Sequence, residues 1–178
     1  LWSMDTDLSD ADASFWGEDS DDYSGHAASG AGDVNGDGYD DFLIGAWGDD
    51  DLGTQSGSVY VFTRAGGEWT QTQKLTASDG EGGDWFSSGL GISGDTIVVG
   101  AMWEDNWDSN SGATYVFERS DGVWTEQQKL TASYTGENQT HYNFGLSVTL
   151  QGNILSVGVP GYDHPGMFGA TAGIGAVY

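Results

Sequence analysis

The chain has 178 residues, of which 28 are acidic and 4 are basic. Its formal net charge of −24 argues against nucleic acid or an anionic membrane as a partner, because both repel a negative surface. Aromatic residues make up 13% of the chain, which argues against a disordered acidic tail. The lack of Cys excludes disulfides and thiolate metal sites, and no apolar run is long enough for a transmembrane helix.

The first predicted element is a β-strand over residues 1–8. Trp2 and Leu8 have the same spacing as Trp69 and Leu75 further along the chain. Because the later pair belongs to a predicted outer strand, we expect residues 1–8 to be the outer strand of a preceding structural unit.

The second element is an acidic loop over residues 33–41, Asp-Val-Asn-Gly-Asp-Gly-Tyr-Asp-Asp. Oxygen-bearing side chains alternate along it, and its two glycines supply the backbone freedom that a tight curl needs. A hard cation such as Ca²⁺ takes six to eight oxygen ligands, more than Mg²⁺ usually takes from protein. The sequence therefore predicts a calcium loop, and the alternative is a plain Gly/Asp-rich hairpin turn. The candidate ligands are Asp33, Asn35, Asp37, the Tyr39 carbonyl and Asp41.

An internal repeat sets the predicted architecture. The segment Lys-Leu-Thr-Ala-Ser at 74–78 recurs 55 residues later (129 minus 74) at 129–133, and Tyr-Val-Phe at 60–62 recurs at 115–117 with the same offset. A looser third copy follows. All four basic residues occupy repeated positions, which favours a structural role for them over a binding patch. A period of this size with short strands predicts a propeller or a similar array.

Within one unit we expect four strands, at residues 90–92, 97–101, 114–117 and 123–130. Four antiparallel strands are the content of one propeller blade. The predicted organisation is all-β, with residues 1–8 from a preceding blade, 9–78 as a calcium-bearing blade, 79–133 as a second blade and 134–178 as a third, incomplete blade. We expect the chain to be an excerpt of a longer polypeptide, or its blades to be completed between subunits by strand exchange.

These motifs resemble the FG-GAP repeat family, the blades of the integrin α-subunit propeller and its bacterial relatives. The segment 32–46, GDVNGDGYDDFLIGA, is similar to the calcium-bearing repeat, and 86–101 and 143–159 are similar to its calcium-free form. The name-giving Phe-Gly occurs as Phe144-Gly145, whereas Phe86-Ser87 departs from it and residues 23–26 replace it in the first unit. The resemblance implies the same five calcium ligands in the loop.

Two other features have open interpretations. The acidic segments 18–22 and 49–51 lack the alternation and glycines of the main loop, so we expect solvated charged loops there. Trp47, Trp103 and Trp107 follow short buried strands. Packing between blades is favoured for them, and stacking on sugars at the propeller rim is the alternative.

The expected function is that of a non-enzymatic, calcium-stabilised extracellular module for adhesion, with a protein or carbohydrate partner at the cell surface, copies of itself included. Extracellular calcium is high enough to fill weak sites, which favours secretion. One alternative is a structural subunit of an extracellular filament or sheath. Another is the non-catalytic propeller part of a secreted hydrolase or lyase. No catalytic motif supports an enzyme within these residues.

Overall fold

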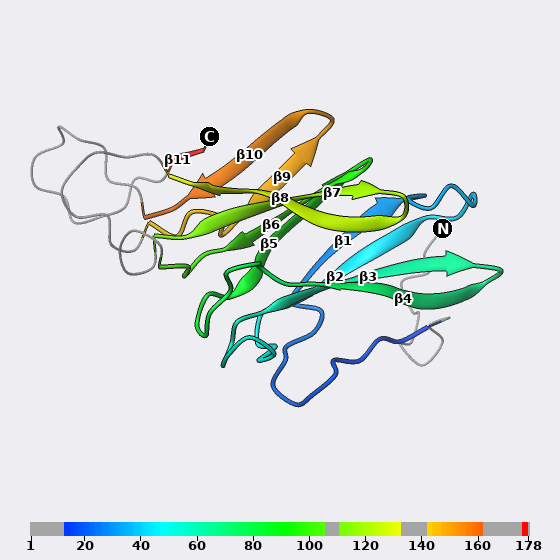
Figure 1. The fold of residues 1–178 in the computed structure, drawn as a ribbon, viewed down its shortest axis with the longest axis horizontal. Coiled ribbons are helices and arrows are strands. Elements are labelled where there is room, and N and C mark those ends of the chain that lie inside the picture. Colours follow the sequence, from blue (N-terminus) through cyan, green and yellow to red (C-terminus); the bar gives the residue numbers. More distant parts are fainter. Residues whose placement is uncertain (1–12, 106–110, 133–141, 162–175, 178) are drawn as a thin grey trace, which may run out of the picture.

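A computed structural model describes residues 13–105, 111–132, 142–161 and 176–177, and every regular element in these ranges is a β-strand. Among the described residues there is no helix that could cross a lipid bilayer. The predicted strand over residues 1–8 lies outside the described residues, as does Trp107. Three antiparallel sheets follow one another along the chain (Figure 1), which confirms the predicted all-β array of successive blades.

The first sheet contains β1 (Ala27–Gly32), β2 (Asp41–Ala46), β3 (Ser58–Ala65) and β4 (Glu68–Leu75), in that spatial order. The two middle strands, β2 and β3, are the most buried, and β2 is buried over almost its whole length. The outer strand β4 is mostly polar and exposed. This gradient follows the sequence, because a strand covered on both faces needs a continuous apolar run, whereas a strand with one wet face alternates.

The second sheet repeats this plan with β5 (Phe86–Ser93), β6 (Thr96–Ala101), β7 (Ala113–Ser120) and β8 (Val123–Thr131). The predicted strands are confirmed, and two of the four, β5 and β7, extend beyond the predicted ends by more than two residues. The predicted hairpin at Asp121-Gly122 has positive φ at both residues, 53° and 82°. Two positive φ values identify a type I′ turn, whose twist matches that of the flanking strands.

The third sheet contains β9 (Val148–Gln151), β10 (Ile154–Val159) and β11 (Ala176–Val177), in the order β11-β10-β9. Its first hairpin closes through Gly152-Asn153, where the first sheet has the long acidic loop.

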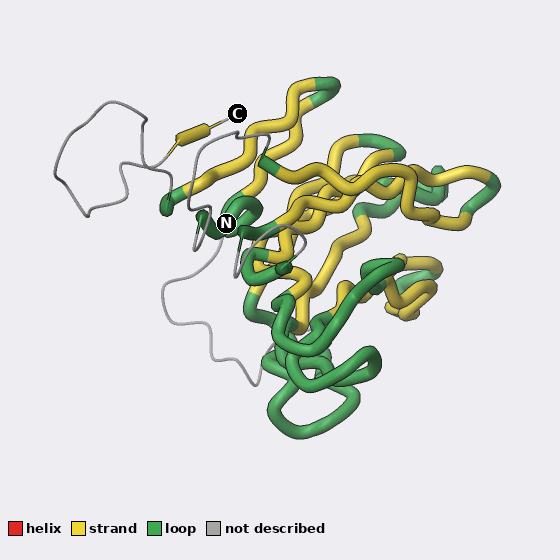
Figure 2. Tube along the Cα trace, turned by 60° about the vertical axis from the view of Figure 1, so that its left-hand side comes forward, coloured by secondary structure: helices red, strands yellow, loops and turns green. Residues whose placement is uncertain are grey.

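The sheets lie side by side with their first strands innermost, so that β1 contacts β5 and β5 contacts β9. Figure 2 shows the longer loops gathered at one end of the array. One apolar cluster lies between the first two sheets and includes Leu43, Val61, Phe86 and Tyr115. A second lies between the second and third sheets and includes Val98 and Phe144 among others. The core is therefore the space between blades, and each sheet needs its neighbour to bury a face.

One backbone turn opens all three units and explains the Phe-Gly motif. The residues at its two ends are Tyr23 and Gly25 in the first unit, Trp85 and Ser87 in the second, and Asn143 and Gly145 in the third. All six have positive φ, between 52° and 94°. In each copy the next residue donates its N–H to the carbonyl of the first. Glycine is favoured at the second end because it adopts positive φ without strain.

The glycine at the second end of the turn in the third unit, Gly145, also permits close packing between blades. A Cβ atom built on Gly100 of β6 would lie 1.8 Å from the Gly145 carbonyl oxygen of the third unit. A side chain at either position would push the sheets apart. The turn therefore fixes the distance between neighbouring blades.

Candidate functional site

The predicted calcium loop connects β1 to β2, and the Gly32–Asp41 pair closes it. Asp33 organises the curl by accepting three backbone N–H groups, from Gly36 at 2.7 Å, Asp37 at 3.0 Å and Gly38 at 2.8 Å. Gly36 and Gly38 have φ of 78° and 92°, so the curl uses the freedom that only glycine supplies cheaply.

The other polar side chains of the loop bond to one another. Asn35 Oδ1 accepts the N–H of Asp37 at 2.9 Å, and Asn35 Nδ2 donates to Asp37 Oδ2 at 3.1 Å. Asp37 Oδ1 accepts the N–H of Tyr39 at 3.0 Å. Four of the candidate residues, 33, 35, 37 and 39, are exposed to solvent, so a cation can reach them.

Asp41 differs from the rest, because its side chain is only 2% exposed. Its two oxygens accept N–H groups from Val34 at 3.0 Å and from Arg64 of β3 at 2.9 Å. This carboxylate therefore joins the start of the loop to the body of the sheet.

The donor set fits a hard cation. A carboxylate offers about four lone-pair positions and an amide oxygen two. Asp33 uses about three in the bonds above, Asp37 and Asp41 about two each, and Asn35 one. Every candidate side chain therefore keeps an oxygen lone pair, and oxygen ligands from flexible chain are what Ca²⁺ takes. Asp33, Asn35, Asp37, the Tyr39 carbonyl and Asp41 are the residues that would hold the ion.

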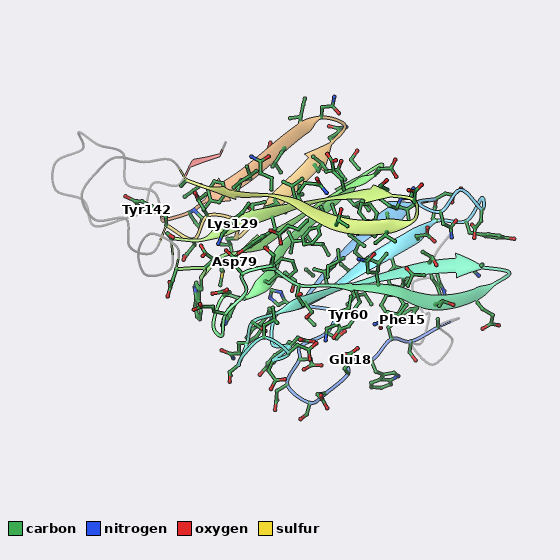
Figure 3. All side chains as sticks on the ribbon, viewed as in Figure 1. Phe15, Glu18, Tyr60, Asp79, Lys129 and Tyr142 are labelled. Carbon is green, nitrogen blue, oxygen red and sulfur yellow. The ribbon has the colours of Figure 1, made fainter. Side chains whose placement is uncertain are left out.

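A second acidic group surrounds Lys74 near the opposite end of the first sheet. The Lys74 ammonium lies 2.8 Å from Glu18, 2.8 Å from Asp49 and 2.5 Å from Asp51. Oxygens of these three carboxylates lie within 4.8 Å of one another. The cluster therefore has the compactness of a metal site, but a lysine ammonium supplies its positive charge. Figure 3 shows Glu18 and Tyr60 at this place.

Asp49 shows the electrostatics of the cluster. Burial by itself would raise the pKa of Asp49, but hydrogen bonds from Lys74 and Tyr60 outweigh burial and lower it. The Tyr60 hydroxyl donates to Asp49 at 2.7 Å. The prediction that segments 18–22 and 49–51 are solvated loops is wrong for Asp22 and Asp49, which are 4% and 3% exposed. Hydrogen bonds compensate both, because the Asp19 N–H bonds to Asp22.

The second sheet repeats the lysine cluster with different acids. Lys129 contacts Asp79 at 2.7 Å and Glu104 at 2.8 Å, and the Tyr115 hydroxyl donates to Asp79 at 2.9 Å. Figure 3 shows Asp79 and Lys129 together at one end of this sheet. Lys74 and Lys129 also lie over the rings of Tyr60 and Tyr115, at 5.3 and 5.2 Å.

The two arginines are engaged as well. Arg119 pairs with Asp95 at 2.6 Å, and Arg64 lies over the rings of Tyr39 and Trp69. Each of the four basic residues thus contacts its own chain, as the repeat predicts.

An acidic pocket of about 310 Å³ lies beside the second lysine cluster. Burial is the main cause that raises the pKa of Asp84 in this pocket to about 6. A hydrogen bond from the Glu81 N–H opposes the rise, and the nearby Glu104 carboxylate adds to it. The pocket is lined by Asp79, Glu81, Gly82, Asp84, Glu104 and Asp105.

Four aromatic rings form a row across the first two blades. Tyr23 stacks on Trp47 with centroids 4.5 Å apart, Trp47 lies 4.1 Å from Trp85, and Trp85 lies 3.8 Å from Trp103. The three tryptophans are half-buried. The packing interpretation of Trp47 and Trp103 therefore agrees with these contacts, since the rings join one blade to the next.

Two FG-GAP repeat models match the chain, one over residues 24–62 and the other over residues 69–117. The chain is an FG-GAP repeat protein. The first match begins in the turn at Tyr23–Gly25 and runs through the acidic loop to β3. The second runs from β4 through the three inner strands of the next sheet. No curated protein gives a significant match to the chain.

FG-GAP repeats are β-propeller-type interaction modules, typically non-catalytic, that occur in extracellular proteins and often bind calcium. Sequence reasoning on this FG-GAP repeat protein missed the acidic pocket and two members of the aromatic row, Tyr23 and Trp85. Both rings could have been recognised from their equivalent positions, because each lies in the turn that opens a unit. The 55-residue offset did not align these turns, because linkers of unequal length precede them.

Proposed function

We propose that this chain is a calcium-stabilised, non-catalytic propeller module that acts outside the cell in adhesion, through a protein or carbohydrate partner. The observation that carries the proposal is the loop at 33–41. Four aspartates and an asparagine lie within nine residues there, and Asp41 connects the loop to the sheet through the N–H of Arg64.

The ion's contribution is to the stability of the first blade. Carboxylates held this close repel one another, and a bound divalent cation replaces repulsion by attraction. A ligand that binds the folded chain and not the unfolded chain stabilises the fold by RT ln(1 + [L]/Kd), about 2.7 kcal/mol at a hundredfold excess over Kd. A rigid loop at a blade end is then available to a partner.

The surface favours a partner with basic or polar character. The chain has a formal charge of −24, and its basic side chains are already engaged within the fold. Exposed rings are also present on the described surface, with Trp16 86% and Tyr23 54% exposed. Rings of this kind stack on sugars and pack at protein interfaces.

Thermal unfolding in calcium and in chelator tests the role of the ion. We expect calcium to raise the Tm of the wild-type chain by several degrees and Asp37→Asn to abolish most of that rise. Asp40→Asn is the matched control, because Asp40 is an exposed neighbour that lies between ligand positions. An equal calcium response in both variants, or none in the wild type, would remove the proposal. The adhesion role is tested by calcium-dependent binding of the labelled chain to cells or glycans, compared between wild type and Asp37→Asn.

A further inference from the structure

The acidic pocket of the second blade contains a buried oxygen without a partner. Glu104 is 6% exposed and is one of the residues that line the pocket. Its Oε1 accepts the Lys129 ammonium at 2.8 Å, whereas its Oε2 is buried with no hydrogen-bond partner. A buried carboxylate oxygen left unpaired is strongly unfavourable, so native structures normally provide a cation or a donor for it.

Comparison of the two lysine clusters shows what is missing. Glu104 corresponds to Asp49 of the first blade, because Gly112 and Gly57 donate their N–H groups to the two backbone carbonyls in the same way, both at 2.9 Å. Ser111 and Ser56 also donate their hydroxyls to these carbonyls.

The side chains at this shared position differ in their partners. Asp49 bonds to Lys74, to Tyr60 and to the N–H of Asp51, so both of its oxygens have partners. Glu104 is one methylene longer and has Lys129 alone. The longer side chain reaches a place where the described residues supply no second positive group.

The charge balance of the pocket points the same way. Five of its six lining residues are acidic, and Lys129 is the basic side chain bonded to them. Asp84 is 6% exposed, which brings a second buried carboxyl group next to Glu104. The raised pKa of Asp84 is consistent with an excess of negative charge here, in addition to the effect of burial.

We propose that this pocket is a second divalent-cation site, in which Glu104 Oε2 and Asp84 hold a partly hydrated ion at the end of the second blade. Water molecules would complete the coordination of the ion, because the acidic side chains of the pocket are widely spaced. Among the described residues, the acidic trio with oxygens within 4.8 Å of one another is the Lys74 cluster, so the acids of the pocket stand further apart. A volume of about 310 Å³ accommodates an ion with several waters, at about 30 Å³ each.

This site is separate from the loop at 33–41. The loop precedes β2, whereas Glu104 follows β6, the corresponding strand of the second sheet. The two sites therefore lie at opposite ends of the blades, and no residue belongs to both. Failure of one leaves the other intact.

Calcium titration calorimetry on four variants tests the proposal. The starting protein is Asp37→Asn, in which the loop at 33–41 is impaired, and Glu104→Gln and Asp84→Asn are added to it singly. The matched control is Asp121→Asn, which removes one negative charge from the hairpin at the far end of the same sheet. Glutamine keeps the shape of Glu104 and can still accept from Lys129, so the fold is preserved.

We expect Asp37→Asn to bind one calcium ion per chain with a Kd of about 0.1–1 mM, the range of weak extracellular sites. Glu104→Gln or Asp84→Asn should weaken this binding at least tenfold, and Asp121→Asn should change it less than twofold. Tryptophan-sensitised Tb³⁺ emission provides a second readout, because Trp85 and Trp103 are chain neighbours of the two proposed ligands. Thermal unfolding in chelator checks that each variant is folded.

Two results would overturn the proposal. One is an Asp37→Asn protein that binds no calcium up to about 10 mM, which would mean that the pocket does not bind calcium. The other is binding that Glu104→Gln and Asp84→Asn reduce no more than Asp121→Asn does. If the loop proposal fails instead, the wild type binds one ion that Asp37→Asn does not affect and Glu104→Gln removes.

Discussion

Ser87 is the residue whose replacement should stabilise the chain. It occupies the second end of the unit-opening turn, where the other two units have Gly25 and Gly145, and its φ is 83°. Ser87 is completely buried, and its Oγ has no hydrogen-bond partner. Gly45 of β2, in the neighbouring sheet, makes room for it, because a Cβ there would lie 2.8 Å from the Ser87 Cβ. Ser87→Gly removes both the strained backbone and the unpaired hydroxyl.

The expected gain follows from these terms. A side chain in the left-handed region is unfavourable by about 1–2 kcal/mol, and a buried unpaired hydroxyl by about 1–3 kcal/mol. Two effects reduce this gain. Glycine makes the unfolded chain more flexible, which lowers the free energy of unfolding by about 0.5–1 kcal/mol, and the packing contacts of the serine side chain are lost. We expect Ser87→Gly to raise the free energy of unfolding by about 1–2 kcal/mol. For a chain of this size that corresponds to a Tm increase of about 2–8 °C.

Urea and thermal unfolding of the two proteins in chelator measure this change, since chelator removes any contribution of bound ions. Ser88→Gly is the matched control. The Ser88 Oγ accepts the Met102 N–H at 3.1 Å and lies 3.4 Å from the Gly145 carbonyl oxygen, so its loss should destabilise the chain by about 1 kcal/mol. If Ser87→Gly were less stable than the wild type, the assignment of strain to this turn would be wrong.

Two further predictions concern packing and charge. Gly100→Ala should lower the free energy of unfolding by about 3 kcal/mol, because its Cβ would lie 1.8 Å from the Gly145 oxygen. Gly30→Ala is the control and should change the free energy of unfolding by less than about 1 kcal/mol, because a Cβ at Gly30 has no atom within 4 Å. Urea unfolding compares the two variants, and equal effects would contradict the close approach of the blades. Asp49 has a lowered pKa in the folded chain, so its contribution is present above its ordinary pKa of 3.8 and is lost as pH falls through the folded value. Asp49→Asn should therefore destabilise the chain at pH 7, and the difference should shrink as the pH is lowered below 3.8. A difference that does not depend on pH would refute the role of its charge.

The sequence predicted the strands well because their signals are local. The apolar run at β6 and the turn residues at Asp121-Gly122 depend on neighbouring residues, and the 55-residue repeat shows the same local signals in two units. The structure shows the predicted sheets. The acidic loop is local too. Its ligand types and glycines lie within nine residues, so its composition and curl could be read directly, while the binding of calcium there stays a prediction.

The tertiary structure decided what the long loops do. Asp49 lies in an acidic segment that the sequence predicts to be a solvated loop, yet it is buried beside Lys74. Glu104 of the second blade is buried beside Lys129 in the same way. Trp85 joins the aromatic row only because the blades bring Trp47 and Trp103 to either side of it. Such contacts join residues from different loops, and burial shifts their energies by amounts that residue type alone does not encode. Local pattern determined the blades of this chain, and the meeting of separate loops around each lysine determined its buried charges.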